Sequence, residues 1–132
     1  MITTAVKYSN VMLVDDNPMD NMVNGQLIAS CGFAKKCNSF ESAKETLEFL
    51  NSADAEELPE VIFLDIIMPE MDGFQFLDEF DKLSESVRKR CKIVLLSSSD
   101  SFKDLNRANK NKLVKKFLNK PLTIEMLAAI NV

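Results

Sequence analysis

Acidic, hydroxyl and basic side chains stand at the ends of four apolar runs in this sequence, and their types suit them to chemistry. Asp15 and Asp16 follow the run VMLV, Asp65 follows VIFL, Ser97 follows IVLL, and Lys120 comes two residues after LVKKFL. Carboxylates that approach one another raise each other's pKa values unless a cation joins them. Oxygen ligands beside a phosphate group suit Mg²⁺, so these residues predict a magnesium site.

A carboxylate in such a site can attack a phosphoryl group. The metal ion and a nearby ammonium would neutralise the charge that builds on the transferring oxygens, and Lys120 is the candidate ammonium. The Ser97 hydroxyl could then donate a hydrogen bond to the transferred group and turn a local charge change into movement of its loop. The predicted chemistry is therefore phosphoryl transfer to an aspartate.

The elements that must position these residues alternate between strands and helices. Apolar runs that stop at a polar residue are typical of buried parallel strands, and apolar residues at a spacing of 3.6 indicate helices. Strands are predicted over residues 11–14, 33–38, 61–64, 92–96 and 113–118. Helices are predicted from Pro18 up to Gly32, over 39–51, 71–83 and 101–109, and from Thr123 to Ile130. Five such pairs make a doubly wound α/β fold, whose ligand sites lie outside the carboxyl ends of the strands.

The composition describes one globular domain. The chain has 132 residues, of which 46% are hydrophobic and 27% charged. A net charge of −4 argues against nucleic-acid binding. The absence of histidine excludes Ser-His and Cys-His catalytic pairs and any phosphohistidine of the chain's own. Three cysteines without metal-ligand spacing, no signal pattern and no membrane-length apolar run predict a cytoplasmic protein with reduced thiols.

Four motifs in order give the chain a resemblance to the receiver domains of two-component response regulators, over roughly residues 10–130. The motifs are LVDDN (13–17), FLDIIMPEMDG (63–73), IVLLSS (93–98) and FLNKPL (117–122). The resemblance implies a flavodoxin-like (βα)5 fold with strand order 2-1-3-4-5. It also implies a single receiver domain over 1–132 of the chemotaxis-regulator kind, without an output domain, that is a signalling protein and not an enzyme acting on other substrates.

Site roles follow from the same resemblance. It implies that Asp65 is phosphorylated by a sensor histidine kinase or a histidine phosphotransfer protein, and that an unknown downstream protein responds. Asp16 would bind Mg²⁺ directly, Asp15 through water, and the backbone carbonyl of Ile67 would be a further ligand. The remaining implied features are Ser97 and Phe117 as switch residues, Lys120 as the catalytic ammonium, and a cis Lys120–Pro121 bond.

Three alternatives stay open at this point. A dehalogenase-like phosphatase also uses an aspartyl nucleophile after a strand, but it requires a second acid two residues later, where this chain has Ile67. A flavodoxin-like FMN carrier must hold a phosphate in its first loop, where Asp15 and Asp16 would repel it. A receiver-like interaction module could bind partners without phosphorylation. Each residue alone also has an ordinary structural interpretation. Asp15 and Asp16 are typical of a helix N-terminus, Lys120 is typical of a solvated surface, and Phe117 is typical of a core.

Overall fold

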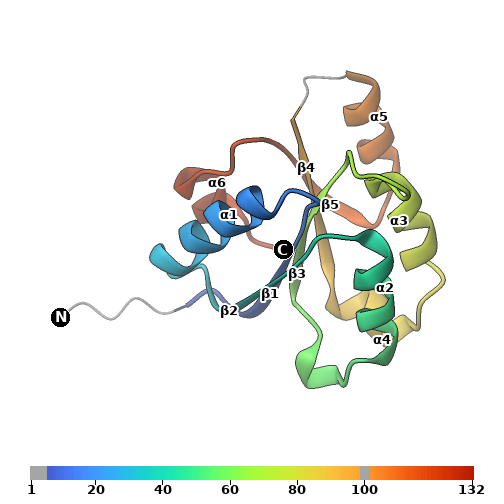
Figure 1. The fold of residues 1–132 in the computed structure, drawn as a ribbon, viewed down its shortest axis with the longest axis horizontal. Helices are drawn as coiled ribbons and strands as arrows, with labels where there is room; N and C mark the ends of the chain where they lie inside the picture. The colour runs from blue at the N-terminus through green and yellow to red at the C-terminus, as the bar shows by residue number, and fades with distance from the viewer. Residues whose placement is uncertain (1–5, 99–101) are drawn as a thin grey trace.

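Five parallel strands form one sheet in the computed structural model, which describes residues 6–98 and 102–132. The strand order is β2-β1-β3-β4-β5, so the predicted doubly wound arrangement is confirmed (Figure 1). The strands are β1 (Tyr8–Val14), β2 (Ala34–Phe40), β3 (Val61–Asp65), β4 (Lys92–Ser97) and β5 (Val114–Asn119).

Helices cover both faces of this sheet. Figure 1 shows α1 and α6 on one face and the other four helices on the opposite face. The helices are α1 (Pro18–Ser30), α2 (Ala43–Ser52), α3 (Gly73–Phe80), α4 (Glu85–Arg90), α5 (Phe102–Lys110) and α6 (Ile124–Ala129), with a 3-10 turn at Ala55–Glu57. Within the described residues, no helix is long and apolar enough to span a bilayer.

The two central strands supply side chains to both layers of the core. Val11 and Leu13 of β1 join the cluster under α1 and α6, whereas Met12 and Val14 join the cluster on the opposite face. Successive side chains of a strand point to opposite faces, and here both faces are covered by helices. This explains why VMLV in β1 and VIFL in β3 are unbroken apolar runs that stop only at the carboxyl edge.

The start of α1 is fixed directly above that edge. The Asn17 side chain accepts hydrogen bonds from the backbone N–H groups of Met19 and Asp20, and Pro18 occupies the first helical position. The Asn21 side chain donates to the carbonyls of Asp15 (2.9 Å) and Phe40 (3.3 Å). The first turn of α1 is therefore attached to the ends of both β1 and β2.

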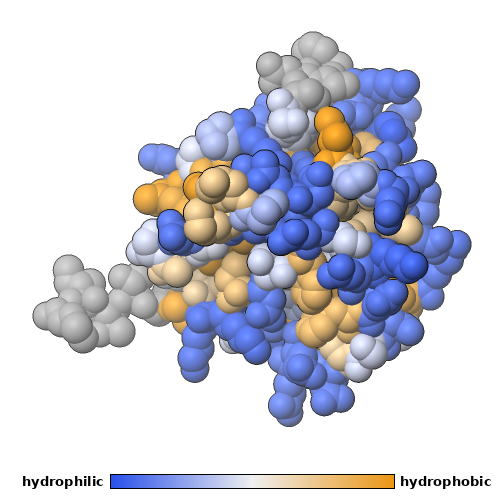
Figure 2. Space-filling model, viewed as in Figure 1, coloured by the Kyte–Doolittle hydropathy of each residue, from blue (hydrophilic) through white to orange (hydrophobic). Residues whose placement is uncertain are grey.

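The 3.6-residue apolar spacing over residues 22–31 predicts that Met22 and Val23 face the core, and this prediction is wrong. Met22 and Val23 are about half exposed (52% and 53%), while Asn21 and Asn24 are buried. The reason is that the strand-end carbonyls need hydrogen-bond donors, which Asn21 supplies and an apolar side chain could not. An orange group of apolar side chains at the left of Figure 2 lies where Figure 1 places α1 and α6.

Two predicted helix boundaries also need correction. Phe40 belongs to β2, where its carbonyl accepts the backbone N–H of Asp15, so the helix predicted over 39–51 begins only at Ala43 after its Ser42 cap. The helix predicted over 71–83 ends at Phe80, and α4 was not predicted. Only one residue of α4, Val87, is buried, so the segment carries almost no periodic apolar signal.

Glu70, in the loop between β3 and α3, holds a backbone conformation that favours glycine. Its φ is 67°, in the left-handed region, where a Cβ atom costs roughly 1–2 kcal/mol. We expect Glu70→Gly to raise the free energy of unfolding by up to about 1 kcal/mol, because the greater freedom of glycine in the unfolded chain offsets part of the relief. Urea unfolding measures the change. Glu70→Ala is the control, since it keeps the Cβ; an equal gain there would rule out backbone strain as the cause.

Candidate functional site

The residues predicted to act together lie at the carboxyl edge of the sheet. Because β1, β3, β4 and β5 are parallel neighbours, the side chains that follow or end them meet at one place. Asp15, Asp16 and Asp65 each offer one carboxylate oxygen, and these oxygens lie within 4.8 Å of one another. Asp15 and Asp65 are buried, whereas Asp16 is exposed to solvent.

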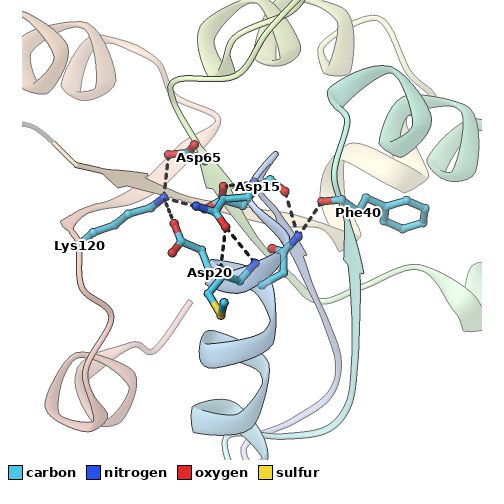
Figure 3. Close-up of polar contacts among 8 residues, drawn as sticks. Asp15, Asp20, Phe40, Asp65 and Lys120 are labelled. Carbon is cyan, nitrogen blue, oxygen red and sulfur yellow. Dashed lines mark hydrogen bonds and ion pairs between the residues drawn. The ribbon is translucent and has the colours of Figure 1, made fainter.

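Lys120 reaches across this cluster from the end of β5 (Figure 3). Its Nζ lies 2.6 Å from Asp15 Oδ2 and 3.2 Å from Asp65 Oδ1. The backbone of Lys120 is fixed to the end of β4, because its N–H donates to the Ser97 carbonyl at 2.7 Å. The Lys120–Pro121 peptide bond is cis, as the resemblance implied.

A fourth carboxylate at the site was not predicted. Asp20 Oδ2 lies 3.2 Å from Lys120 Nζ, and Asp20 is the third residue of α1. The available signal is its position: Asp20 follows the end of β1 by six residues and lies in the first turn of α1, which starts above the strand ends. A side chain in the first turn of that helix points back toward the helix start and so over the sheet edge.

Burial and nearby charges shift the pKa values of Asp65 and Lys120. Burial raises the pKa of the Asp65 carboxyl from its ordinary 3.8 to about 6, and the nearby Asp15 charge adds to the rise; Lys120 opposes both. Burial lowers the pKa of Lys120, but hydrogen bonds and charges from Asp15 and Asp65 outweigh it and leave that pKa raised. The lysine therefore stays charged. Keeping the Asp65 carboxylate ionised lowers the stability of the folded protein, and a further cation at the site would remove that penalty.

The donor set suits a hard divalent cation. Carboxylate oxygens within a few ångströms, one of them from a solvent-exposed residue, are typical of sites that hold Mg²⁺ with retained water. Asp15 already accepts hydrogen bonds on both oxygens, from Lys120 and from the backbone N–H of Asn17 at 2.9 Å. Asp16 and Asp65 are therefore better placed than Asp15 to be direct ligands.

The loop after β3 closes tightly under Asp65. Gly73 N–H donates to the Ile66 carbonyl at 2.8 Å, and a Cβ on Gly73 would lie only 2.9 Å from the Asp65 carbonyl oxygen. Glycine is thus needed for the backbone to pass this close to the strand end. The Ile67 side chain in the same loop is 63% exposed. Its carbonyl as a metal ligand stays a prediction.

The two predicted switch residues lie on adjacent strands but differ in burial. Ser97 is buried at the end of β4, in register with Asn119 of β5. Phe117 is half-buried, three residues before Lys120, and packs against the core on the α5 side. It lines a surface hollow of about 300 Å³ between β5 and α5. The switch roles of Ser97 and Phe117 stay a prediction.

Comparison with known proteins agrees with this geometry. The family model of the response regulator receiver domain matches residues 11–131. The chain belongs to this family. This receiver domain is therefore a member of a family of two-component signalling proteins, which confirms the resemblance found in the sequence.

Relatives and solved structures fit the same assignment. The receiver domain is 32% identical over 119 residues to the probable methanogenesis regulatory protein FilR2 of Methanothrix harundinacea, covering 89% of this chain and 75% of that protein. It is 30% identical to the two-component response regulator ORR1 of rice, covering 86% of this chain and 50% of that protein, so it spans about half of the rice protein's length.

Among solved structures, a two-component response regulator from Cytophaga hutchinsonii superposes with a TM-score of 0.86 at 27% identity, over 95% of this chain and 93% of that one. A response regulator receiver protein from Dyadobacter fermentans gives 0.82 at 31% identity, over 90% and 91%. Both confirm the fold over nearly the whole chain.

Proposed function

We propose that this receiver domain accepts a phosphoryl group on Asp65 in a Mg²⁺-dependent reaction, from the phosphohistidine of a sensor histidine kinase or histidine phosphotransfer protein. One observation carries the proposal: the ammonium of Lys120 lies 3.2 Å from a carboxylate oxygen of Asp65, inside a cluster of acids at the carboxyl edge of the sheet. An ammonium in this position can bind a group attached to Asp65.

The transfer uses groups that the chain itself supplies. An oxygen of the Asp65 carboxylate attacks phosphorus and forms a P–O bond, while the P–N bond of the donor breaks and the imidazole leaves with its electron pair and takes up a proton. Lys120 donates hydrogen bonds to the phosphoryl oxygens and offsets their charge. Mg²⁺, held by Asp16 and Asp65, with Asp15 acting through water and the Ile67 carbonyl as a further ligand, would offset more of that charge.

Signalling would follow from the change at the edge of β4. The Ser97 hydroxyl, at the end of β4, would move toward the new phosphoryl oxygens, and the β4–β5 pairing would connect that movement to Phe117. Phe117 borders a surface hollow, so its displacement alters the shape that a downstream protein meets. The function is therefore a change in partner binding and not turnover of a separate substrate. We infer no direct role for nucleic acid or membrane.

Incubation with acetyl phosphate, with and without Mg²⁺, tests the proposal. We expect intact-mass measurement to show one added phosphoryl group only when Mg²⁺ is present. Borohydride reduction of the acyl phosphate, followed by peptide mapping, should place it at Asp65. Failure to take up the group, or uptake at another residue, would contradict the proposal and favour an interaction module that works without phosphorylation.

A further inference from the structure

We propose that Asp20 is a positioning residue for Lys120. Asp20 binds one of the three N–H donors of the ammonium and so withholds it from the phosphoryl group, and the Asp20 charge makes the site favour Mg²⁺ over the incoming anion. The inference rests on the proposed function, since it concerns the same lysine and the same acceptor. It adds a residue that lies outside the metal cluster and outside the four matching motifs.

Asp20 is one of three carboxylates that contact the ammonium of Lys120. An ammonium has three N–H donors, and Lys120 Nζ has three carboxylate neighbours: Asp15 at 2.6 Å, and Asp20 and Asp65 both at 3.2 Å. Figure 3 shows the lysine between Asp65 on one side and Asp20 on the other. A phosphoryl group on Asp65 needs at least one of these donors, and Asp20 is a competitor for it.

Asp20 is also fixed in place by its own turn of helix. Its backbone N–H donates to the Asn17 side chain at 3.3 Å, and the backbone N–H of Asn17 donates to Asp15 Oδ1 at 2.9 Å. Asp15, Asn17 and Asp20 thus form one hydrogen-bonded turn. The Asp20 side chain is 42% exposed, compared with 7% for Asp65. Water can therefore replace the lysine as the partner of the Asp20 carboxylate, so releasing Lys120 costs Asp20 little free energy.

The charge of Asp20 acts in opposite directions on the two ligands of the site. In the described part of this edge, Asp15, Asp20 and Asp65 contact Lys120, and Asp16 lies in the same acid cluster, so the site carries an excess of negative charge. That excess attracts a divalent cation and repels a phosphoryl group. Removing the Asp20 charge should therefore weaken Mg²⁺ binding and strengthen phosphoryl binding, whereas damage to the fold would weaken both.

Asp20→Asn separates these effects in two NMR titrations, one with Mg²⁺ alone and one with beryllofluoride, an inert phosphoryl analogue, at saturating Mg²⁺. For this partly exposed charge we expect roughly two- to fivefold weaker Mg²⁺ binding and roughly two- to fivefold tighter beryllofluoride binding. Asp20→Glu keeps the charge and should restore both affinities toward those of the wild type.

Glu45→Gln is the matched control, because Glu45 is likewise the third residue of its helix, is exposed, and loses the same single charge. It should leave both affinities unchanged. Unchanged affinities in Asp20→Asn, or a fall in both, would overturn the role of Asp20 while leaving the phosphoacceptor function standing. If the wild-type protein bound no beryllofluoride, the proposed function would fail first and this inference with it.

Discussion

Replacing Asp65 by asparagine is expected to raise the free energy of unfolding of the metal-free protein at neutral pH by roughly 2–3 kcal/mol, while abolishing phosphoryl uptake. Burial and the Asp15 charge raise the pKa of Asp65 from 3.8 to about 6 even though Lys120 is in contact. Holding that carboxylate ionised therefore weakens the folded state. The amide is uncharged and nearly the same shape, so it removes the penalty, but it offers no nucleophilic oxygen.

The sign of the pH dependence follows from the direction of the shift. Below about pH 4 the carboxyl is protonated in both the folded and the unfolded chain, and the penalty is absent. Between about pH 4 and pH 6 the folded state binds more protons than the unfolded state, so stability falls as the pH rises. Above about pH 6 the penalty is fully present. The difference between variant and wild type should thus be near zero at pH 4 and reach its full size above pH 6.

Urea unfolding in EDTA at a series of pH values measures this difference, because the titrations of the other acids occur in both proteins. Adding Mg²⁺ should stabilise the wild type more than Asp65→Asn, since the variant lacks one carboxylate ligand. Glu45→Gln serves as the control for loss of an exposed charge. If the variant were no more stable than the wild type at neutral pH, ionised Asp65 would carry no penalty from burial or from the Asp15 charge, and the prediction would be wrong.

The positions of the site residues were predictable because parallel strands place their carboxyl ends together. Each of the runs ending at Asp15, Asp65 and Ser97 is buried on both faces, so the first polar residue marks the sheet edge. The one site residue that was missed, Asp20, belongs to a helix. Its contact with Lys120 depends on the angle at which α1 leaves β1, which Asn17 and Asn21 set through hydrogen bonds to the backbone.

The elements that were placed less well carry little apolar signal. β2 is an edge strand whose residues are mostly exposed or half-buried, so the sequence pattern at its end, Phe40, resembles the start of a helix. On α1, the 3.6-residue spacing favours Met22 and Val23 as core, but the hydrogen-bonding needs of the strand-end carbonyls put Asn21 inside. In both places backbone polar groups, which a hydrophobic pattern does not report, decided the structure.

Lys120→Met should have the opposite effect on the metal-free protein and lower its free energy of unfolding at neutral pH by about 3 kcal/mol. The lysine is the cation shared by Asp15 and Asp65, whose side chains are only 6% and 7% exposed. Methionine keeps much of the packing volume but leaves these two buried carboxylates without their cation. Removing one member of a buried ion pair is far more damaging than removing an exposed charge.

Magnesium should reverse most of this loss. A divalent cation compensates the same carboxylates, and the repulsion between Lys120 and the metal is absent in the variant, so the stabilisation by saturating Mg²⁺ should be larger in Lys120→Met than in wild type. Phosphoryl uptake from acetyl phosphate should nevertheless fall by about a hundredfold or more, because no ammonium remains to hold the transferring oxygens.

Lys116→Met is the matched control: Lys116 lies on β5, the strand that leads to Lys120, but it is exposed, and its loss should change neither stability nor uptake appreciably. Urea unfolding with EDTA or Mg²⁺, together with intact-mass kinetics, gives both readouts. If Mg²⁺ stabilised Lys120→Met less than wild type, the lysine would be needed to shape the metal site and not only to balance its charge. If uptake stayed normal in the variant, another group would have to supply the positive charge that transfer requires.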